Sequence, residues 1–147
     1  MTDEIDGLPP SMRERVSFYL YRDAITATGL ADGILRELDL TARQVGILTL
    51  VIEREPMSQR ALGETIGVDR TTMVALVDDL ERRGYVERHR DPEDRRAFLI
   101  QPTEAGAAAQ KRAVELLDEC ERRYLAVLDP EEQRQLLQLL ARLYNRP

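Results

Sequence analysis

Residues 59–84 constrain the fold of this chain most, because they predict two short helices separated by a glycine turn. Ser58 can cap the first helix, QRALGETIG, which ends at Gly67, and Asp69 can cap the second, RTTMVALVDDLERRG, which ends at Gly84. Serine and aspartate are preferred helix N-caps, and glycine is favoured just beyond a helix C-terminus. The spacing therefore predicts a helix-turn-helix.

The apolar residues of this stretch fall where the two helices of such a motif pack on each other. Gly63 supplies a small residue where the helices approach closely. The second helix exposes its N-terminal end, which in such motifs enters the major groove of DNA, where arginine can bond guanine and threonine can meet a phosphate or a thymine methyl. An ordinary helical hairpin is the alternative. The packing positions are Leu62, Ile66, Val68, Met73 and Leu76, and the DNA-facing positions are Arg70, Thr71 and Thr72.

An extended pattern follows directly, at residues 85–90 and 97–100. The turn sequence DPED stands between them at 91–94, so the pair predicts a β-hairpin, the only strong strand signal in the chain. A helix-turn-helix followed by a hairpin is a winged helix, and a narrow minor groove attracts arginines from such a wing. We expect the acids to turn the tip and to hold arginine side chains; a solvated charged loop is the alternative. The arginines concerned are Arg88, Arg90, Arg95 and Arg96.

Helical patterns also precede the winged helix. Ser11 and Glu14 form a capping-box pattern that predicts a first helix over about 11–36, after an arm over 1–10 that we expect to be flexible. A second capping box, Thr41 to Gln44, starts a helix over 42–53. Because this helix is apolar around most of its circumference, we expect it to be central.

Two further helices are predicted after the hairpin. The first runs over about 103–127, and the second begins at Asp129, which is followed by a proline at the first helical position. The expected fold class is therefore mainly α with one small β-hairpin. The last helix places apolar residues on one face, namely Leu136, Leu139, Leu140 and Leu143.

Composition narrows the classes of function. The chain has 147 residues, about one domain's worth, and a formal net charge of -6. An acidic balance excludes a wholly basic nucleic-acid coat but not DNA binding, because affinity for phosphate depends on where the positive charge lies. With one cysteine, Cys120, and one histidine, His89, we expect no disulfide framework, no metal and no cofactor.

The sequence gives no sign of an enzyme or of a membrane protein. It contains no paired carboxylates, nucleophile–base set or phosphate loop, so we expect no catalytic activity. No apolar run approaches the length of a membrane span, and the acidic N-terminus is unlike a signal peptide. We therefore expect a cytoplasmic protein.

Four motifs together resemble the MarR family of winged-helix transcriptional regulators, over residue 30 to about 145. The combination is specific and covers most of the chain. Some family members carry arginines farther along the recognition helix, where this chain has Ala75 and Asp79. Base reading would then depend more on the start of that helix. The motifs are LTARQ at 40–44, GVDRTTMVALVDDLERRG at 67–84, YVERHRDPEDRRA at 85–97 and TEAG at 103–106.

The resemblance implies the quaternary organisation and the domain limits. It implies an obligate homodimer formed by interleaved N- and C-terminal helices, with a separate DNA-binding lobe that binds a palindromic operator. We interpret the protein as a repressor. We expect a single domain over 11–147, with dimerisation helices at 11–38 and 103–147 and a winged helix-turn-helix lobe at 41–101. The alternative is a winged-helix protein-interaction module that has lost specific DNA binding.

The resemblance also implies roles for single residues. Asp94 and Arg96 fall on the wing motif of the family, and the acid at Asp69 is expected to pair with Arg96, which would tie the recognition helix to the wing. Either Arg95 or Arg96 would enter the minor groove. The start of the preceding helix adds expected DNA contacts at Ser58, Gln59 and Arg60.

A small-molecule effector is implied as well. Family members often bind small aromatic acids between the dimer helices and the DNA lobe, and Tyr19 and Arg22 on the first helix could hold a carboxylate-bearing aromatic. Packing at the dimer interface is the alternative for both residues. Peroxide-sensing relatives use a cysteine in the first helix, where this chain has none, so we assign no sensor role to Cys120.

Overall fold

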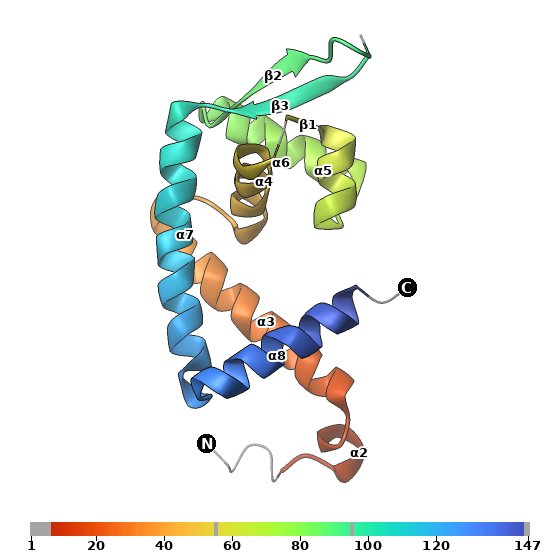
Figure 1. Ribbon diagram of the computed structural model, residues 1–147, viewed down its shortest axis with the longest axis vertical. Helices are drawn as coiled ribbons and strands as arrows, with labels where there is room; N and C mark the ends of the chain where they lie inside the picture. The colour runs from red at the N-terminus through yellow and green to blue at the C-terminus, as the bar shows by residue number, and fades with distance from the viewer. Residues whose placement is uncertain (1–6, 55, 95, 146–147) are drawn as a thin grey trace.

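The computed structural model describes residues 7–54, 56–94 and 96–145 as a helical protein with one small sheet (Figure 1). The sheet and three short helices form a lobe at one end, α3 and α8 lie at the other, and α7 runs between them. This agrees with the predicted class, mainly α with a small β element. In chain order the elements are α2 (Pro10–Arg13), α3 (Val16–Leu35), η1 (Arg36–Leu38), α4 (Ala42–Glu53), β1 (Met57–Ser58), α5 (Gln59–Ile66), α6 (Arg70–Arg82), β2 (Val86–Arg90), β3 (Phe98–Pro102), α7 (Glu104–Tyr124), η2 (Leu125–Val127) and α8 (Pro130–Tyr144).

The sheet has the order β1-β3-β2, and both pairings are antiparallel. The predicted hairpin is β2 and β3, with Arg90 opposite Phe98 and Val86 opposite Pro102. The second strand is longer than the predicted 97–100, since it continues to Pro102. The two-residue strand β1 was not predicted; it makes β3 the central strand and fixes the start of α5 on the sheet.

The hydrophobic core belongs to the lobe and the adjoining turn of each long helix. Helix α4 is central as predicted, with Val45, Ile47, Leu48 and Val51 all buried. Burial of each such side chain stabilises the fold by roughly 1.5–3 kcal/mol. The other buried apolar residues are Leu35, Leu40, Leu62, Met73, Val77, Leu80, Val86, Ile100 and Ala113.

The predicted first helix is broken. Helix α2 ends at Arg13 and α3 begins at Val16, with Arg15 in an extended conformation between them. The predicted capping box at Ser11 is wrong, because Ser11 lies inside α2 and no side chain caps either helix. The break is stabilised from the side, since Arg15 Nε donates to the Ser11 carbonyl (2.9 Å) and the Tyr19 hydroxyl donates to the Arg13 carbonyl (2.9 Å).

The other predicted caps are confirmed. Thr41 and Gln44 form the capping box of α4, with Thr41 N donating to Gln44 Oε1 at 2.9 Å. Asp129 caps α8 through the amides of Glu131 and Glu132. Helix α7 is capped by Thr103, and its regular turns end at Tyr124, three residues before the predicted end.

Helix α7 begins in close contact with the hairpin. The Thr103 amide donates to the Tyr85 carbonyl (3.1 Å), and the Thr103 hydroxyl donates to the Gly84 carbonyl (2.6 Å). A Cβ on Gly106 would lie 2.0 Å from the Tyr85 carbonyl oxygen, so only glycine permits this approach. None of the helices in the described ranges is long and apolar enough to cross a membrane.

Candidate nucleic-acid interface

The helix-turn-helix is formed by α5 and α6, as predicted. Gly67 adopts a left-handed conformation with φ of 77° at the end of α5. A Cβ at Gly63 would lie 3.1 Å from the Val68 carbonyl oxygen, so the small residue is needed where the helices meet. Met73 is buried behind the turn. These contacts fix the direction in which α6 leaves the turn.

The N-terminal end of α6 presents two exposed residues, Arg70 and Thr71. Asp69 caps the helix, accepting from the Thr72 amide (3.0 Å) and the Thr72 hydroxyl (2.6 Å). These two bonds hold the pKa of Asp69 below its usual value, and the bond from the hydroxyl has the larger effect. Because the Thr72 hydroxyl is engaged by the cap, Thr72 has only its methyl group left for a contact, whereas Arg70 and Thr71 offer their polar groups to a ligand.

The start of α5 contributes a second row of predicted residues. Ser58 caps α5, its Oγ accepting from the Ala61 amide at 3.2 Å. Arg60 is exposed and its Nε donates to Glu64 Oε1 at 2.9 Å, which raises the pKa of the arginine. A surface pair of this kind contributes little to stability.

The wing is turned by its acids through backbone contacts. Asp91 Oδ1 accepts from the Glu93 amide (2.8 Å), and Asp94 Oδ1 accepts from the Arg96 amide (2.9 Å). The predicted turning role is therefore present. Arg90 lies over the ring of Phe98, 5.3 Å from its centroid, on the opposite strand. Arg95, a predicted DNA contact, lies outside the described residues.

The predicted pair between Asp69 and Arg96 is not formed in this structure. The Asp69 carboxylate accepts instead from Thr72, and within the described ranges no ion pair joins it to Arg96. Arg96 is exposed on the wing. The physical reason is that two sets of bonds compete for the Asp69 carboxylate. The bonds from Thr72 are local to α6, whereas an ion pair with Arg96 would require a long side chain to be held in one conformation.

A different arginine ties the wing to α6. The Arg88 guanidinium is bound by Asp78 and Glu81 of α6, and its Nε donates to Gln59 Oε1 of α5 at 3.1 Å. Its side chain is 19% exposed. We predicted Arg88 as a DNA contact, but in the structure its guanidinium is bound by residues of the protein itself. The spacing of charges along the wing sequence did not indicate these partners.

Comparisons with known proteins agree with this geometry. A model of the MarR family matches residues 38–97. A putative transcriptional regulatory protein for the hcr operon of Thauera aromatica is 31% identical over 136 residues, which are 92% of this chain and 82% of that protein. A MarR-family transcriptional regulator from Rhodococcus sp. RHA1 has a TM-score of 0.85 at 30% identity, over 92% of this chain and 96% of its own.

The chain belongs to the MarR family. It is a DNA-binding transcriptional regulator and not an enzyme. The transcriptional repressor CouR bound to a 23-mer DNA duplex has a TM-score of 0.87 at 28% identity, over 92% of this chain and 96% of its own. CouR from Rhodococcus jostii RHA1 bound to p-coumaroyl-CoA has a TM-score of 0.82 at 30% identity, over 95% and 98%.

One polar network of this MarR-family lobe was missed by sequence reasoning. The buried Gln44 donates through Nε2 to Asp79 Oδ2 at 2.7 Å, and Arg83 pairs with both Asp79 and Asp39. Burial alone would raise the pKa of Asp79, but bonds from Gln44, Arg83 and Arg82 outweigh it and lower that pKa. Asp79, noted in the sequence only as a departure from arginine, joins α4 to α6, and Arg83 extends the network to the turn after η1.

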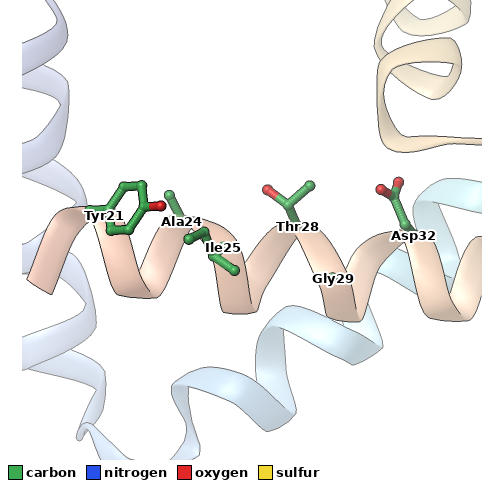
Figure 2. Close-up of a pocket in the computed structure, with 6 residues that line it drawn as sticks. All are labelled: Tyr21, Ala24, Ile25, Thr28, Gly29 and Asp32. Carbon is green, nitrogen blue, oxygen red and sulfur yellow. The ribbon is translucent and has the colours of Figure 1, made fainter.

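The side chains predicted to hold an effector do not line either of two hollows beside α3. The larger, about 420 Å³, follows one face of α3, where Figure 2 shows Tyr21, Ala24, Thr28 and Asp32 on the same side of the helix. The smaller, about 340 Å³, lies over the network around Asp79. Tyr19 instead supports the break between α2 and α3, and Arg22 is exposed.

The single histidine and the single cysteine lie at the surface and in helix packing, respectively. His89 is exposed on β2, with Nε2 3.3 Å from Glu87 Oε2. Cys120 is half-buried on α7. Within the described ranges, no cluster of histidine, cysteine or acidic side chains has the geometry to hold a metal ion.

Proposed function

We propose that the protein is a dimeric repressor that binds a palindromic DNA operator and releases it when a small ligand binds. The observation that carries this proposal is the exposed N-terminal end of α6, where Arg70 and Thr71 face solvent in the same lobe as the arginine-bearing wing. The hairpin extends from the end of the molecule opposite α3 and α8 (Figure 1). The likeness to CouR bound to a DNA duplex supports it.

The proposed contacts follow from these positions. The start of α6 reads base edges in the major groove, the start of α5 meets phosphates, and the wing enters the minor groove. Asp69 and Asp94 support these elements through their cap and turn bonds. Arg88 is withdrawn from the set because its partners lie within the protein. The proposed contact residues are Ser58, Gln59, Arg60, Arg70, Thr71, Thr72, Arg90, Arg95 and Arg96.

A homodimer through residues 11–38 and 103–147 completes the proposal, with 41–101 as the DNA-binding lobe. The apolar face of α8 supports it: no residue of α8 is buried in one protomer, and Leu137 and Leu139 are 70% and 55% exposed. Covering such a face removes apolar area from water. A regulator of this kind works where the DNA is, so we keep a cytoplasmic location as part of the proposal.

The proposed effector is a small aromatic acid bound beside α3. CouR was solved with p-coumaroyl-CoA, a thioester of an aromatic acid, which supports the aromatic part of this ligand class but not its free carboxylate. The larger hollow on α3 has the aromatic Tyr21 at one end and Asp32 at the other. Tyr19 and Arg22 lie on the same helix but do not line this hollow, so Arg22 stays the proposed carboxylate partner on the ground of the sequence alone. Operator release in the presence of single aromatic acids tests it, and Arg22→Gln should weaken that release.

Selection from a random DNA duplex library at near-physiological salt tests the central proposal. We expect a two-fold symmetric motif with half-sites about 10 bp apart, one helical turn. Arg70→Ala should lose that motif while it keeps the thermal stability of the wild type, because Arg70 is exposed. Recovery of no motif by a folded dimer would contradict the proposal and favour a protein-interaction module.

A salt titration separates these two functions further. Binding that depends on phosphate contacts weakens steeply with salt, because each contact releases condensed counterions. Binding of a protein partner through the same lobe should show a much smaller dependence. The acidic net charge of -6 favours the protein-interaction module slightly, and the salt titration decides between it and DNA binding.

A further inference from the structure

Arg88 occupies a fixed place where three elements of the lobe meet. It stands on β2 opposite the buried Ile100 of β3, so the sheet fixes its backbone. Its amide donates to Glu81 Oε1 at 3.2 Å, and its guanidinium binds the same carboxylate through the other oxygen. Glu81 therefore holds both the backbone and the side chain of Arg88.

The nitrogens of the Arg88 guanidinium are all directed at partners inside the protein. Nη1 binds Glu81, Nη2 binds Asp78, and Nε donates to Gln59 Oε1 at 3.1 Å. A DNA phosphate would have to displace a carboxylate to gain a comparable bond. This bonding distinguishes Arg88 from Arg70 and Arg96, which are exposed.

We propose that Arg88 is a positioning residue that sets the placement of the wing relative to the recognition helix α6, and that it acts on DNA binding without contacting DNA. This proposal rests on the proposed function. Asp78 and Glu81 lie one turn apart on α6, and the wing reaches that helix through the bonds of Arg88. A wing released from α6 would have to be brought into register with the major-groove contacts on binding, at a cost in affinity.

The same arginine has an electrostatic effect on the DNA-binding face. Asp78 and Glu81 are 59% and 39% exposed on the recognition helix, where two unpaired carboxylates would repel phosphates. Arg88 reduces their combined charge by one. It also fixes the amide of Gln59, because the opposite orientation would place two donors face to face.

Affinity for the selected operator across a salt series tests the proposal. Arg88→Met should bind roughly tenfold more weakly, because its wing would still reach the groove but would have to be ordered on binding instead of being held in place beforehand. Because no phosphate contact is removed, the slope of log K against log salt should stay at the wild-type value. The matched control is Arg96→Met, a proposed contact, for which the slope should fall by about 0.9 per protomer.

Two further variants separate positioning from charge and from folding. Arg88→Lys keeps the charge but not the three-way bonding, so it should recover only part of the affinity. R88M/E81Q has the net charge of the wild type and lacks the clamp, by which we mean the bonds of Arg88 to Asp78, Glu81 and Gln59. It should recover only the part of the affinity that depends on charge and should still bind well below the wild type. Wild-type affinity in R88M/E81Q would overturn the positioning role.

Amide hydrogen exchange in the free protein tests the clamp without DNA. In Arg88→Met the amides of β2 and β3 should exchange faster, whereas those of α4 should be unchanged. A slope reduced as much as in Arg96→Met would make Arg88 a DNA contact and overturn the proposal. Unchanged exchange would overturn it too. If the wild-type protein selects no duplex, the proposed function fails, and the exchange result alone decides whether the clamp exists.

Discussion

The lobe and the two helices farthest from it obtain their structure in different ways. All buried apolar side chains of the described residues lie between Leu35 and Ala113, in and around α4, α5, α6 and the sheet. Helix α8 has none, and α3 has only Leu35. The lobe therefore carries its own core. Within one protomer α8 is stabilised mainly by local helix signals, whereas α3, which has no side-chain cap, is supported by its contacts with α7.

The two outer helices, α3 and α8, carry apolar residues that are exposed in one protomer. Val16, Ile25 and Leu30 of α3 are exposed, as are five leucines of α8. Helix α8 nevertheless begins with a complete capping box at Asp129. A chain can thus specify a helix locally and leave its packing to a second molecule, and substitutions in the two regions should differ in effect.

The largest effect is expected from a cavity in the lobe. Leu48→Ala, at a fully buried position of α4, should lower the free energy of unfolding by about 2–5 kcal/mol. Leu137→Ala, at a position 70% exposed on α8, should change it far less when measured on the monomer at low concentration. Urea unfolding of both variants checks the comparison, and equal losses would contradict it.

The next largest effect is expected from a charge on the outer helices. Leu140→Glu on α8 should disrupt the proposed dimer by roughly 2–4 kcal/mol, because it buries a carboxylate in an apolar contact. Light scattering after size-exclusion chromatography should give the mass of one chain, with the helical content of the lobe retained. A dimer of unchanged stability would mean that this face of α8 is not the interface.

A smaller effect is expected at the boundary between the two regions. Thr41→Ala removes the cap of α4 and should cost about 1 kcal/mol. Thr41→Ser keeps the hydroxyl and serves as the control. Thermal unfolding should rank the wild type and Thr41→Ser together above Thr41→Ala; if all three unfold alike, the capping box is not stabilising.

The smallest effect is expected from the pH dependence of the network around Asp79. The pKa of Asp79 in the folded protein lies below the usual value of an aspartate. The carboxylate therefore stabilises the fold above that usual value, and the stabilisation is lost as pH falls through the folded pKa. The difference in unfolding free energy between the wild type and Asp79→Asn should therefore shrink in acid. Asp118→Asn, an exposed change of equal charge, should show no such trend.

Local signals explain how much of this molecule could be predicted. The helix-turn-helix, the caps at Ser58, Asp69 and Asp129, and the hairpin depend on residues within a few positions of one another, and all are present. The break at Arg15 was missed because it depends on side-chain bonds to carbonyls that the helical pattern does not show.

The details of the interface could be predicted only in part, for the same reason. Arginines on a wing indicate a phosphate surface, but Arg88 finds its acids on a helix that ends several residues earlier in the chain. The bond between Gln44 and Asp79 spans 35 positions. Such pairings arise from the packing of elements, which spacing along one element does not encode.

Gly106, at the start of α7, couples this helix to the hairpin, so the two should move together. Gly106 sits against the Tyr85 carbonyl, so the upper end of α7 cannot slide independently of the hairpin. The helix has 21 residues and is therefore about 31 Å long. A tilt of roughly 5° at its far end would move the hairpin by about 3 Å, close to the rise of one base pair. In the proposed dimer, small rotations between protomers would thus be converted into steps on the scale of the DNA.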